Sequence, residues 1–226
     1  MADAATYPPE PWHLRGSLLV SVLLVPRAQV PRLADALPPG HRPVLVGGRV
    51  LLGVALVGYV PGGEVVYDEL LTAVLTRPTG SLRAHVTIPR IWVSTAPALA
   101  GGRELWAIPK ELCAVERHET ASAVHAEVTA EAEPVARLTA RLGRRLLPGR
   151  VPLPLTTAQR ALTGRGAVVS RNRVTAEVRA LRARWRFAPR GALAHLAGRR
   201  PLASVALTGA DIVFGQQVRR DQEVAP

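Results

Sequence analysis

Apolar residues recur along this chain in short runs, and most of these runs have the length and alternation typical of β-strands. Residues 16–25 and 50–60 are continuous runs rich in valine and leucine, well short of the roughly 20 residues of a membrane-spanning helix. Turn signals stand beside them, a Gly-Gly pair at 47–48 and a Pro-Gly-Gly sequence at 61–63. The pattern therefore predicts strands and no membrane span.

The rest of the chain shows the same hydrophobic pattern, and it predicts more strands than helices. The predicted strands are residues 16–25, 44–46, 50–60, 64–76, 81–94, 122–129, 135–142, 167–169, 174–187 and 202–214. Short helices are predicted at residues 29–37, 96–105 and 191–197, and a long proline-rich loop at 147–155. This pattern indicates a mainly β (α+β) fold, a closed or nearly closed antiparallel β-barrel with a few short helices. We expect residues 1–226 to form a single domain.

The composition is that of a globular chain and adds an expectation about its location. Apolar residues make up 48% of the sequence and the mean hydropathy is +0.13, which is enough for a core. Residues 1–13 carry acidic residues and prolines where a secretory signal would be basic and then apolar. The single cysteine, Cys113, excludes an internal disulfide. We therefore expect a cytoplasmic protein without membrane association.

The charge introduces nucleic-acid binding as an alternative, because the formal net charge is +12 and the pI is about 11.4. Its distribution argues against that alternative. Arginines are spread from Arg15 to Arg220, and only four Trp, three Tyr and two Phe are available for stacking on bases. Because no helix-turn-helix or RNA-binding sheet motif is present either, we expect no nucleic-acid partner.

The distribution of basic residues singles out one position. Of 29 basic residues only Lys110 is a lysine. Arginine cannot lose its proton in a protein, whereas a lysine amine can do so and attack a carbonyl carbon. The residues around Lys110 are Leu105, Trp106, Ile108, Pro109 and Leu112, and apolar surroundings disfavour the charged form of an amine. The sequence therefore makes Lys110 a candidate nucleophile. The alternative is that Lys110 is an exposed surface lysine without a catalytic role.

The segment around this lysine can be placed in a known family. GGRELWAIPKEL, residues 101–112, resembles the signature of the acetoacetate decarboxylase family, in which the lysine after the proline forms a Schiff base. YPPEPW at 7–12 is similar to the family's N-terminal segment, and YDEL at 67–70 to the segment that carries its active-site glutamate. The resemblance implies that Lys110 forms the Schiff base and that Glu69 is the glutamate. It also implies a cone-like antiparallel β-barrel that assembles into a homo-oligomer.

Three departures from the family pattern bear on the substrate. Glu111 stands where the parent reaction uses a second lysine, Val54 stands near the place of an additional glutamate, and Arg15 lies only just before the expected early arginine. Fewer polar groups favour a larger and more apolar carbonyl compound over a small oxo acid. We therefore expect little or no decarboxylation of acetoacetate itself.

These considerations give a set of candidate site residues. The catalytic candidates are Lys110, Glu69 as general acid or base, and Glu111 as a second group for proton transfer. The substrate-binding candidates are Trp106, Val54, Arg103 and Glu104. Arg103 and Glu104 could instead pair with each other or fix the loop that bears Lys110, and Glu111 could be a solvated charge.

No metal or cofactor is expected. The histidines show no pair at metal-ligand spacing with a third carboxylate nearby; they are His13, His41, His85, His118, His125 and His195. Cys113 has no evident base beside it and is interpreted as a core residue.

Two functional hypotheses follow. The first is a Schiff-base lyase, of aldolase, dehydratase or decarboxylase type, that acts on an oxo acid or a larger polyketide-like carbonyl compound. The second is a barrel of the same fold without imine chemistry, which binds or cyclises an apolar small molecule in secondary metabolism. Trapping a carbonyl compound on the protein with borohydride separates the two.

Overall fold

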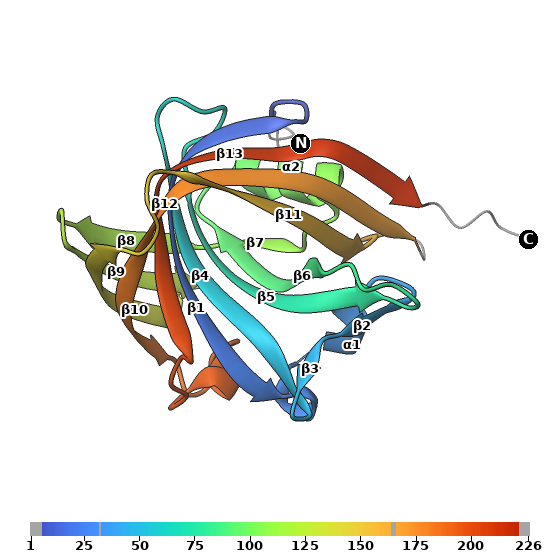
Figure 1. The fold of residues 1–226 in the computed structure, drawn as a ribbon, viewed down its shortest axis with the longest axis horizontal. Coiled ribbons are helices and arrows are strands. Elements are labelled where there is room, and N and C mark those ends of the chain that lie inside the picture. The colour runs from blue at the N-terminus through green and yellow to red at the C-terminus, as the bar shows by residue number, and fades with distance from the viewer. Residues whose placement is uncertain (1–5, 32, 164–165, 222–226) are drawn as a thin grey trace, which may run out of the picture.

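The computed structural model describes residues 6–31, 33–163 and 166–221, and one large curved sheet dominates it (Figure 1). Its strands are β1 (Trp12–Pro26), β2 (His41–Pro43), β3 (Leu45–Val46), β4 (Arg49–Val60), β5 (Asp68–Pro78), β6 (His85–Val93), β7 (Lys110–Leu112), β8 (Ala114–Glu119), β9 (Ala123–Ala130), β10 (Glu133–Arg145), β11 (Val151–Arg160), β12 (Ala167–Phe187) and β13 (Ala203–Asp221). The helical segments are η1 (Arg27–Gln29), α1 (Leu33–Ala36), α2 (Ala96–Trp106) and η2 (Ala194–Leu196).

The strand order explains how the sheet encloses an interior. Neighbouring strands follow the order β11-β6-β5-β4-β1-β13-β12-β10-β9-β8, and β11 also pairs with β12. The pairing is antiparallel except between β6 and β11 and between β6 and β7. Because β11 pairs with both β6 and β12, the two sides of the sheet meet, and Figure 1 shows the long strands curving around the space between them. The predicted mainly β fold with few helices is confirmed.

Alternate side chains of the curved strands enter two apolar cores. The inner core lies within the curve of the sheet and includes Trp12, Ile91, Trp106 and Ile212. The outer core includes residues from β1, α1, β10 and η2, namely Leu19, Leu23, Leu33, Leu138 and Leu196. The inner core contains the candidate site.

The chief error of the strand prediction lies at residues 147–155, where β11 begins at Val151. Pro152 and Pro154 suggested a loop, but both are strand residues and lie opposite Thr175 and Arg173 of β12. Proline has no backbone N–H, so two prolines that are two residues apart remove two hydrogen-bond donors from the same edge of a strand. That loss is tolerated because β6 pairs with β11 only at Thr157.

Other predicted elements differ in extent. The strands predicted at 167–169 and 174–187 are one continuous strand, β12, which absorbs register shifts against β13. The helix predicted at 29–37 is reduced to η1 and α1, with Pro31 between them. The helix predicted at 191–197 is the short η2, and β7 and β8 were not predicted at all. In the described parts of the chain, no helix is long and apolar enough to cross a membrane.

Candidate functional site

Lys110 is positioned by the turn that ends α2. Ala107 caps the helix with a left-handed backbone at φ 53°, and its N–H donates to the carbonyl of Arg103. The N–H of Ile108 donates to the carbonyl of Gly102 at 3.0 Å. The chain then turns through Pro109 into β7, where Lys110 lies beside Ile91 of β6 in parallel register. A rigid cap and a strand pairing therefore fix the lysine on both sides.

The two glycines before this turn allow close approach. A Cβ on Gly101 would lie 2.5 Å from the ring of Trp12, and a Cβ on Gly102 would overlap Cδ and Cε of Lys110. The stem of Lys110 therefore lies directly on the backbone of α2, where any side chain would displace it. The Gly-Gly pair is a packing requirement of this site.

We expect Gly102→Ala to lower both stability and Lys110 reactivity. In an ordinary helix interior this change raises stability by up to about 1 kcal/mol. Here the new methyl group overlaps the lysine stem, and overpacking of this kind costs about 1–3 kcal/mol. Thermal unfolding and the rate of imine trapping measure the two effects. A stabilised variant with unchanged trapping would contradict the predicted contact.

The Lys110 amine belongs to a buried hydrogen-bonded triangle with Glu69 and Tyr67. Its Nζ donates to Glu69 Oε2 at 3.2 Å and to the Tyr67 hydroxyl at 3.3 Å. The Tyr67 hydroxyl donates in turn to Glu69 Oε2 at 3.4 Å. Lys110 is 3% exposed and Glu69 5%. The amine and the carboxylate can exchange a proton directly, shielded from bulk water.

Two tyrosines complete the polar end of the site. The rings of Tyr59 and Tyr67 lie 4.4 Å apart. Burial, and then the negative charge of Glu69, raise the pKa of both hydroxyls well above the usual value. Both tyrosines are therefore neutral hydrogen-bond donors at physiological pH and do not compete with Glu69 as bases.

These groups stand at one end of an apolar cavity of about 280 Å³. Its walls come from β1, β4, β5, β6, β11, β12, β13 and the segment from α2 to β7. The aromatic and aliphatic residues of the wall include Trp12, Leu18, Val57, Leu71, Ile91, Trp106, Leu207 and Phe214. Among the lining residues that the structure describes, Lys110 and Glu69 are the only charged ones. An uncharged, largely apolar small molecule fits these surroundings best.

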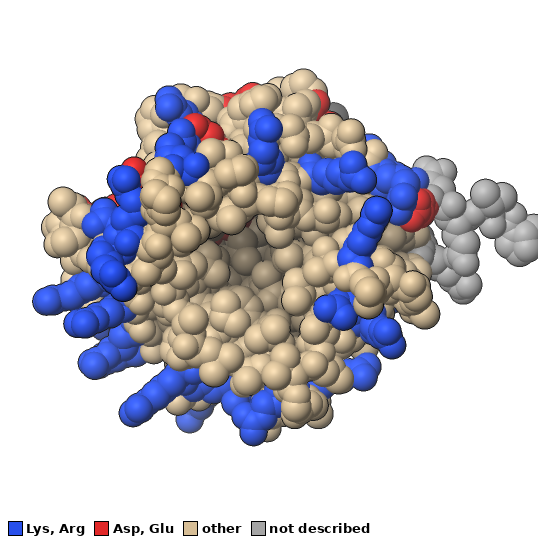
Figure 2. Space-filling view, in the orientation of Figure 1, with Lys and Arg blue, Asp and Glu red and all other residues tan. Residues whose placement is uncertain are grey.

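The cavity opens to solvent within the curve of the sheet. Figure 2 shows a hollow in this face, over the space that the long strands surround in Figure 1, and uncharged residues border it. Lys and Arg side chains lie mostly towards the periphery of the view. The positive charge of the chain therefore does not line the approach to the cavity.

The structure brings together three of the predicted site residues. Lys110, Glu69 and Trp106 all line the cavity. Trp106 is buried, with its ring 4.8 Å from that of Trp12 and 4.6 Å from that of Phe214. It therefore forms part of an aromatic wall.

Two of the predicted site residues, Val54 and Glu111, point away from the cavity. Val54 is fully buried in the outer core, whereas its neighbours Gly53 and Ala55 line the cavity. Glu111 faces away from the cavity, with 51% of its side chain exposed, and pairs with Arg90 at 3.5 Å. Successive strand residues point to opposite faces, so neither Val54 nor Glu111 lines the cavity.

The structure places Arg103 and Glu104, the other two predicted substrate-binding residues, on α2. Both are exposed on α2 and neither lines the cavity. Glu104 Oε2 accepts a hydrogen bond from the Tyr7 hydroxyl at 2.6 Å, which ties the N-terminal segment to α2. Glu104 is therefore a structural anchor, and the anticipated pair between Arg103 and Glu104 is absent from the ion pairs of the described residues.

Sequence reasoning missed Tyr67, Tyr59 and the small residues that line the cavity. Tyr67 precedes Glu69 by two positions, so the alternation of an extended chain could have placed both on one face. Tyr59 lies in a run that was interpreted only as a strand. Gly53 and Ala73 gave no sequence signal, because their register pairing across β4 and β5 emerges only from the fold.

The remaining chemical groups are structural. Burial raises the pKa of the Cys113 thiol to about 12, so the thiol stays protonated, consistent with its packing against the outer core. His41 and His85 hydrogen-bond each other at 3.1 Å. Within residues 6–31, 33–163 and 166–221, no group of three His, Cys, Asp or Glu side chains could hold a metal ion.

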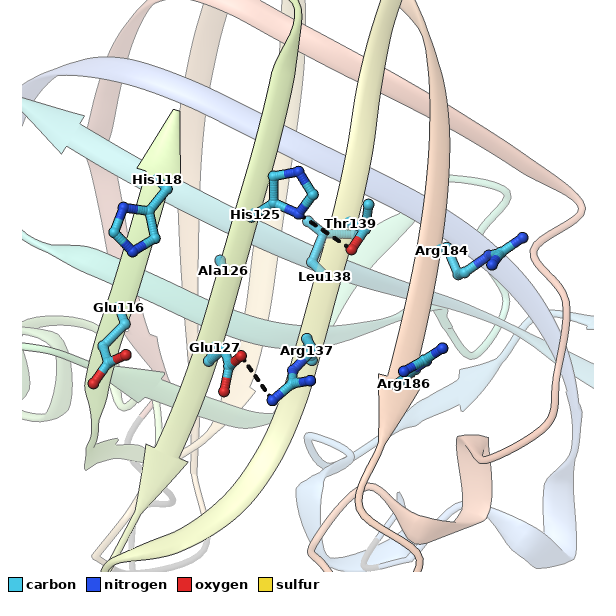
Figure 3. Close-up of a pocket in the computed structure, with 10 residues that line it drawn as sticks. All are labelled: Glu116, His118, His125, Ala126, Glu127, Arg137, Leu138, Thr139, Arg184 and Arg186. Carbon is cyan, nitrogen blue, oxygen red and sulfur yellow. Dashed lines mark hydrogen bonds and ion pairs between the residues drawn. The ribbon is translucent and has the colours of Figure 1, made fainter. Parts of the chain in front are cut away.

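A second depression, of about 400 Å³, lies on the face formed by β8, β9, β10 and β12 (Figure 3). The strand register aligns its side chains in two rows, Glu116–Glu127–Arg137–Arg186 and His118–His125–Thr139–Arg184. Arg137 pairs with Glu127 at 2.7 Å, and His125 hydrogen-bonds Thr139 at 3.4 Å. Its charged groups are all exposed, and none of its lining residues belongs to the Lys110 cavity. It offers no buried nucleophile.

A curved sheet around an apolar cavity that holds a buried amine is typical of a protein that binds a small molecule. The chain belongs to the acetoacetate decarboxylase family, whose sequence model matches residues 8–184. Comparison with curated proteins gives no significant match.

Solved structures share this fold at low sequence identity. Acetoacetate decarboxylase from Legionella pneumophila is 14% identical with a TM-score of 0.74, covering 97% of this chain and 90% of the other. An acetoacetate decarboxylase-like enzyme from Sphingomonas wittichii is 17% identical with a TM-score of 0.63, covering 99% and 95%. The enduracididine biosynthesis enzyme MppR, complexed with the condensation product of pyruvate and imidazole 4-carboxaldehyde, is 16% identical with a TM-score of 0.63, covering 99% and 93%.

Proposed function

We propose that this protein is a Schiff-base enzyme in which Lys110 attacks the carbonyl carbon of an uncharged, mainly apolar substrate. One observation carries the proposal: Lys110 is 3% exposed in an apolar cavity, and among the described residues its amine contacts one charged group, Glu69 at 3.2 Å. The Glu69 carboxylate is placed to receive the proton that the amine must lose before it can attack.

The step can be written with its protons balanced. Glu69 takes a proton from Lys110, and the free electron pair on Nζ forms a bond to the carbonyl carbon. The nitrogen then gives its second proton to the former carbonyl oxygen, which becomes the hydroxyl of a neutral carbinolamine. Protonated Glu69 gives its proton to this hydroxyl, which leaves as water, and Glu69 is again a carboxylate. The Tyr67 hydroxyl, within hydrogen-bond distance of both groups, is placed to orient them during this exchange. The product is an iminium ion covalently attached to Lys110.

The iminium withdraws electrons from the adjacent carbon, so a bond to that carbon can be broken or formed. Decarboxylation, aldol cleavage or addition, and dehydration all use this intermediate, and each places the protein among the lyases. MppR, which has a similar fold, is complexed with the condensation product of pyruvate and imidazole 4-carboxaldehyde, and this supports carbonyl condensation as one of the candidate reactions. We propose that the curved sheet acts as a closed barrel around the reaction, since β11 pairs with both β6 and β12.

Acetoacetate is a poor substrate on this proposal, and we expect little or no carbon dioxide release from it. A small oxo acid would bury its carboxylate, but no arginine of the described residues lines the cavity, and Arg15 is 60% exposed and paired with Asp211. Burying an unpaired carboxylate costs several kcal/mol, which the short chain cannot offset. Carbon dioxide release from acetoacetate, compared with thermal-shift and trapping assays on longer carbonyl compounds, measures this preference. Efficient turnover of acetoacetate with no gain from added apolar bulk would contradict it.

The alternative is a protein of this fold that binds or cyclises an apolar molecule without an imine, and the largely apolar wall favours it. Reduction with borohydride in the presence of a carbonyl compound separates the two functions. An adduct on Lys110 supports the Schiff-base enzyme. Tight binding without any adduct supports the alternative. That the protein is a homo-oligomer remains a prediction, which light scattering in solution tests.

A further inference from the structure

The β4–β5 side of the cavity contains a gap in its wall. Gly53 and Ala73 are register partners on these strands, and both face the cavity together with Ala55. Elsewhere the wall is built from larger aliphatic and aromatic side chains. We call the space in front of Gly53 and Ala73 the slot.

The glycine in the slot is not required by the backbone or by packing. Its φ lies outside the left-handed region, and a Cβ built on it would have only Ala73 in ordinary contact, at 3.8–3.9 Å. Gly102, by contrast, has no room for a Cβ. A strand glycine with open space beside it weakens the strand and marks a place where a ligand approaches the backbone.

Apolar side chains continue along β1 and β4 beside the slot. Val20 and Leu207 line the cavity and are half-buried. Leu24 and Leu51, paired across β1 and β4, are also half-buried, whereas their neighbours Leu23, Val25 and Leu52 are fully buried in the outer core. An apolar path therefore continues along these strands from the slot.

We propose that the slot binds the unbranched hydrocarbon tail of a substrate whose carbonyl carbon lies at Lys110, so that Gly53 and Ala73 set the chain length accepted. The substrate class is a carbonyl compound with a linear, uncharged aliphatic chain. The position of the carbonyl group at Lys110 rests on the proposed Schiff-base function. The tail site is inferred separately, from the shape of the cavity. A charged tail is disfavoured because, in the described part of the chain, the cavity has no charged lining residue other than Lys110 and Glu69 to pair with it.

Linear aldehydes from propanal to decanal, trapped with borohydride and detected by intact mass, test the proposal. In the wild-type protein the concentration for half-maximal trapping should fall by about fourfold per added methylene until the slot is filled. Gly53→Leu should weaken trapping of octanal and decanal by about 16-fold, the loss of roughly two methylene contacts, and leave propanal unchanged. Ala73→Val narrows the slot from the opposite strand and should shift the preference in the same direction.

Ala114→Leu, an enlargement at an exposed position of β8, is the matched control and should retain the wild-type series. The same series of linear alcohols, followed by the fluorescence of Trp12 and Trp106, reports binding without imine formation. Length-dependent alcohol binding that Gly53→Leu shortens, with no aldehyde trapped, would support the slot and overturn the Schiff-base function. Trapping that does not depend on chain length, or that Gly53→Leu and Ala114→Leu leave equally unchanged, would overturn the slot and leave the Schiff-base function standing.

Discussion

Replacing Lys110 by arginine should abolish imine trapping and lower turnover by roughly 10³-fold or more. Arginine keeps a positive charge opposite Glu69, but it cannot lose a proton and so cannot attack a carbonyl carbon. Because Lys110 is the only lysine of the chain, the α-amino group is the only other primary amine that could be trapped. Peptide mapping of the reduced adduct therefore assigns the site without ambiguity.

A second lysine provides the control for this experiment. Arg103→Lys in the Lys110→Arg background places an exposed lysine on α2, seven residues from the original amine. This double variant should remain inactive, because an exposed amine stays protonated at neutral pH. Circular dichroism and thermal unfolding establish that both variants fold. Wild-type turnover in folded Lys110→Arg would show that the reaction needs no imine and would favour the alternative function.

Much of this site could be predicted from the sequence, because its signals are local. Lys110 was identified by its isolation among arginines and by the segment that surrounds it, and the structure places it in the cavity. The segment YDEL predicts Glu69 as a site residue, and Glu69 Oε2 lies 3.2 Å from the Nζ of Lys110. Both predictions depended on the residue itself and its immediate neighbours.

The errors arose where the direction of a side chain or a pairing across strands decided the outcome. Val54 and Glu111 were each chosen by similarity of position, and each is one residue away from one that lines the cavity. A shift of one residue in a strand moves a side chain to the opposite face. Pro152 and Pro154 suggested a loop because the sequence does not show that this part of β11 pairs only with β12. The direction of a side chain and the partner of each strand are known only once the sheet has been assembled.

Glu69→Gln should lower kcat by about 10²–10⁴-fold and change KM little, as expected for a group that moves a proton in the transition state. Glutamine keeps the size of the side chain and can still accept a hydrogen bond from Lys110, but it cannot take up the proton that the amine must lose. The substitution therefore separates proton transfer from packing around the amine.

Glu131→Gln is the control, because Glu131 is exposed in the turn between β9 and β10 and has no contact with the cavity. Its turnover should equal that of the wild-type protein. With Glu69→Gln, slow but complete trapping by borohydride is expected, since Lys110 is still present and only its deprotonation is impaired. Equal kcat in the two variants, or a loss confined to KM, would remove Glu69 from proton transfer and leave it as a partner that only orients the lysine.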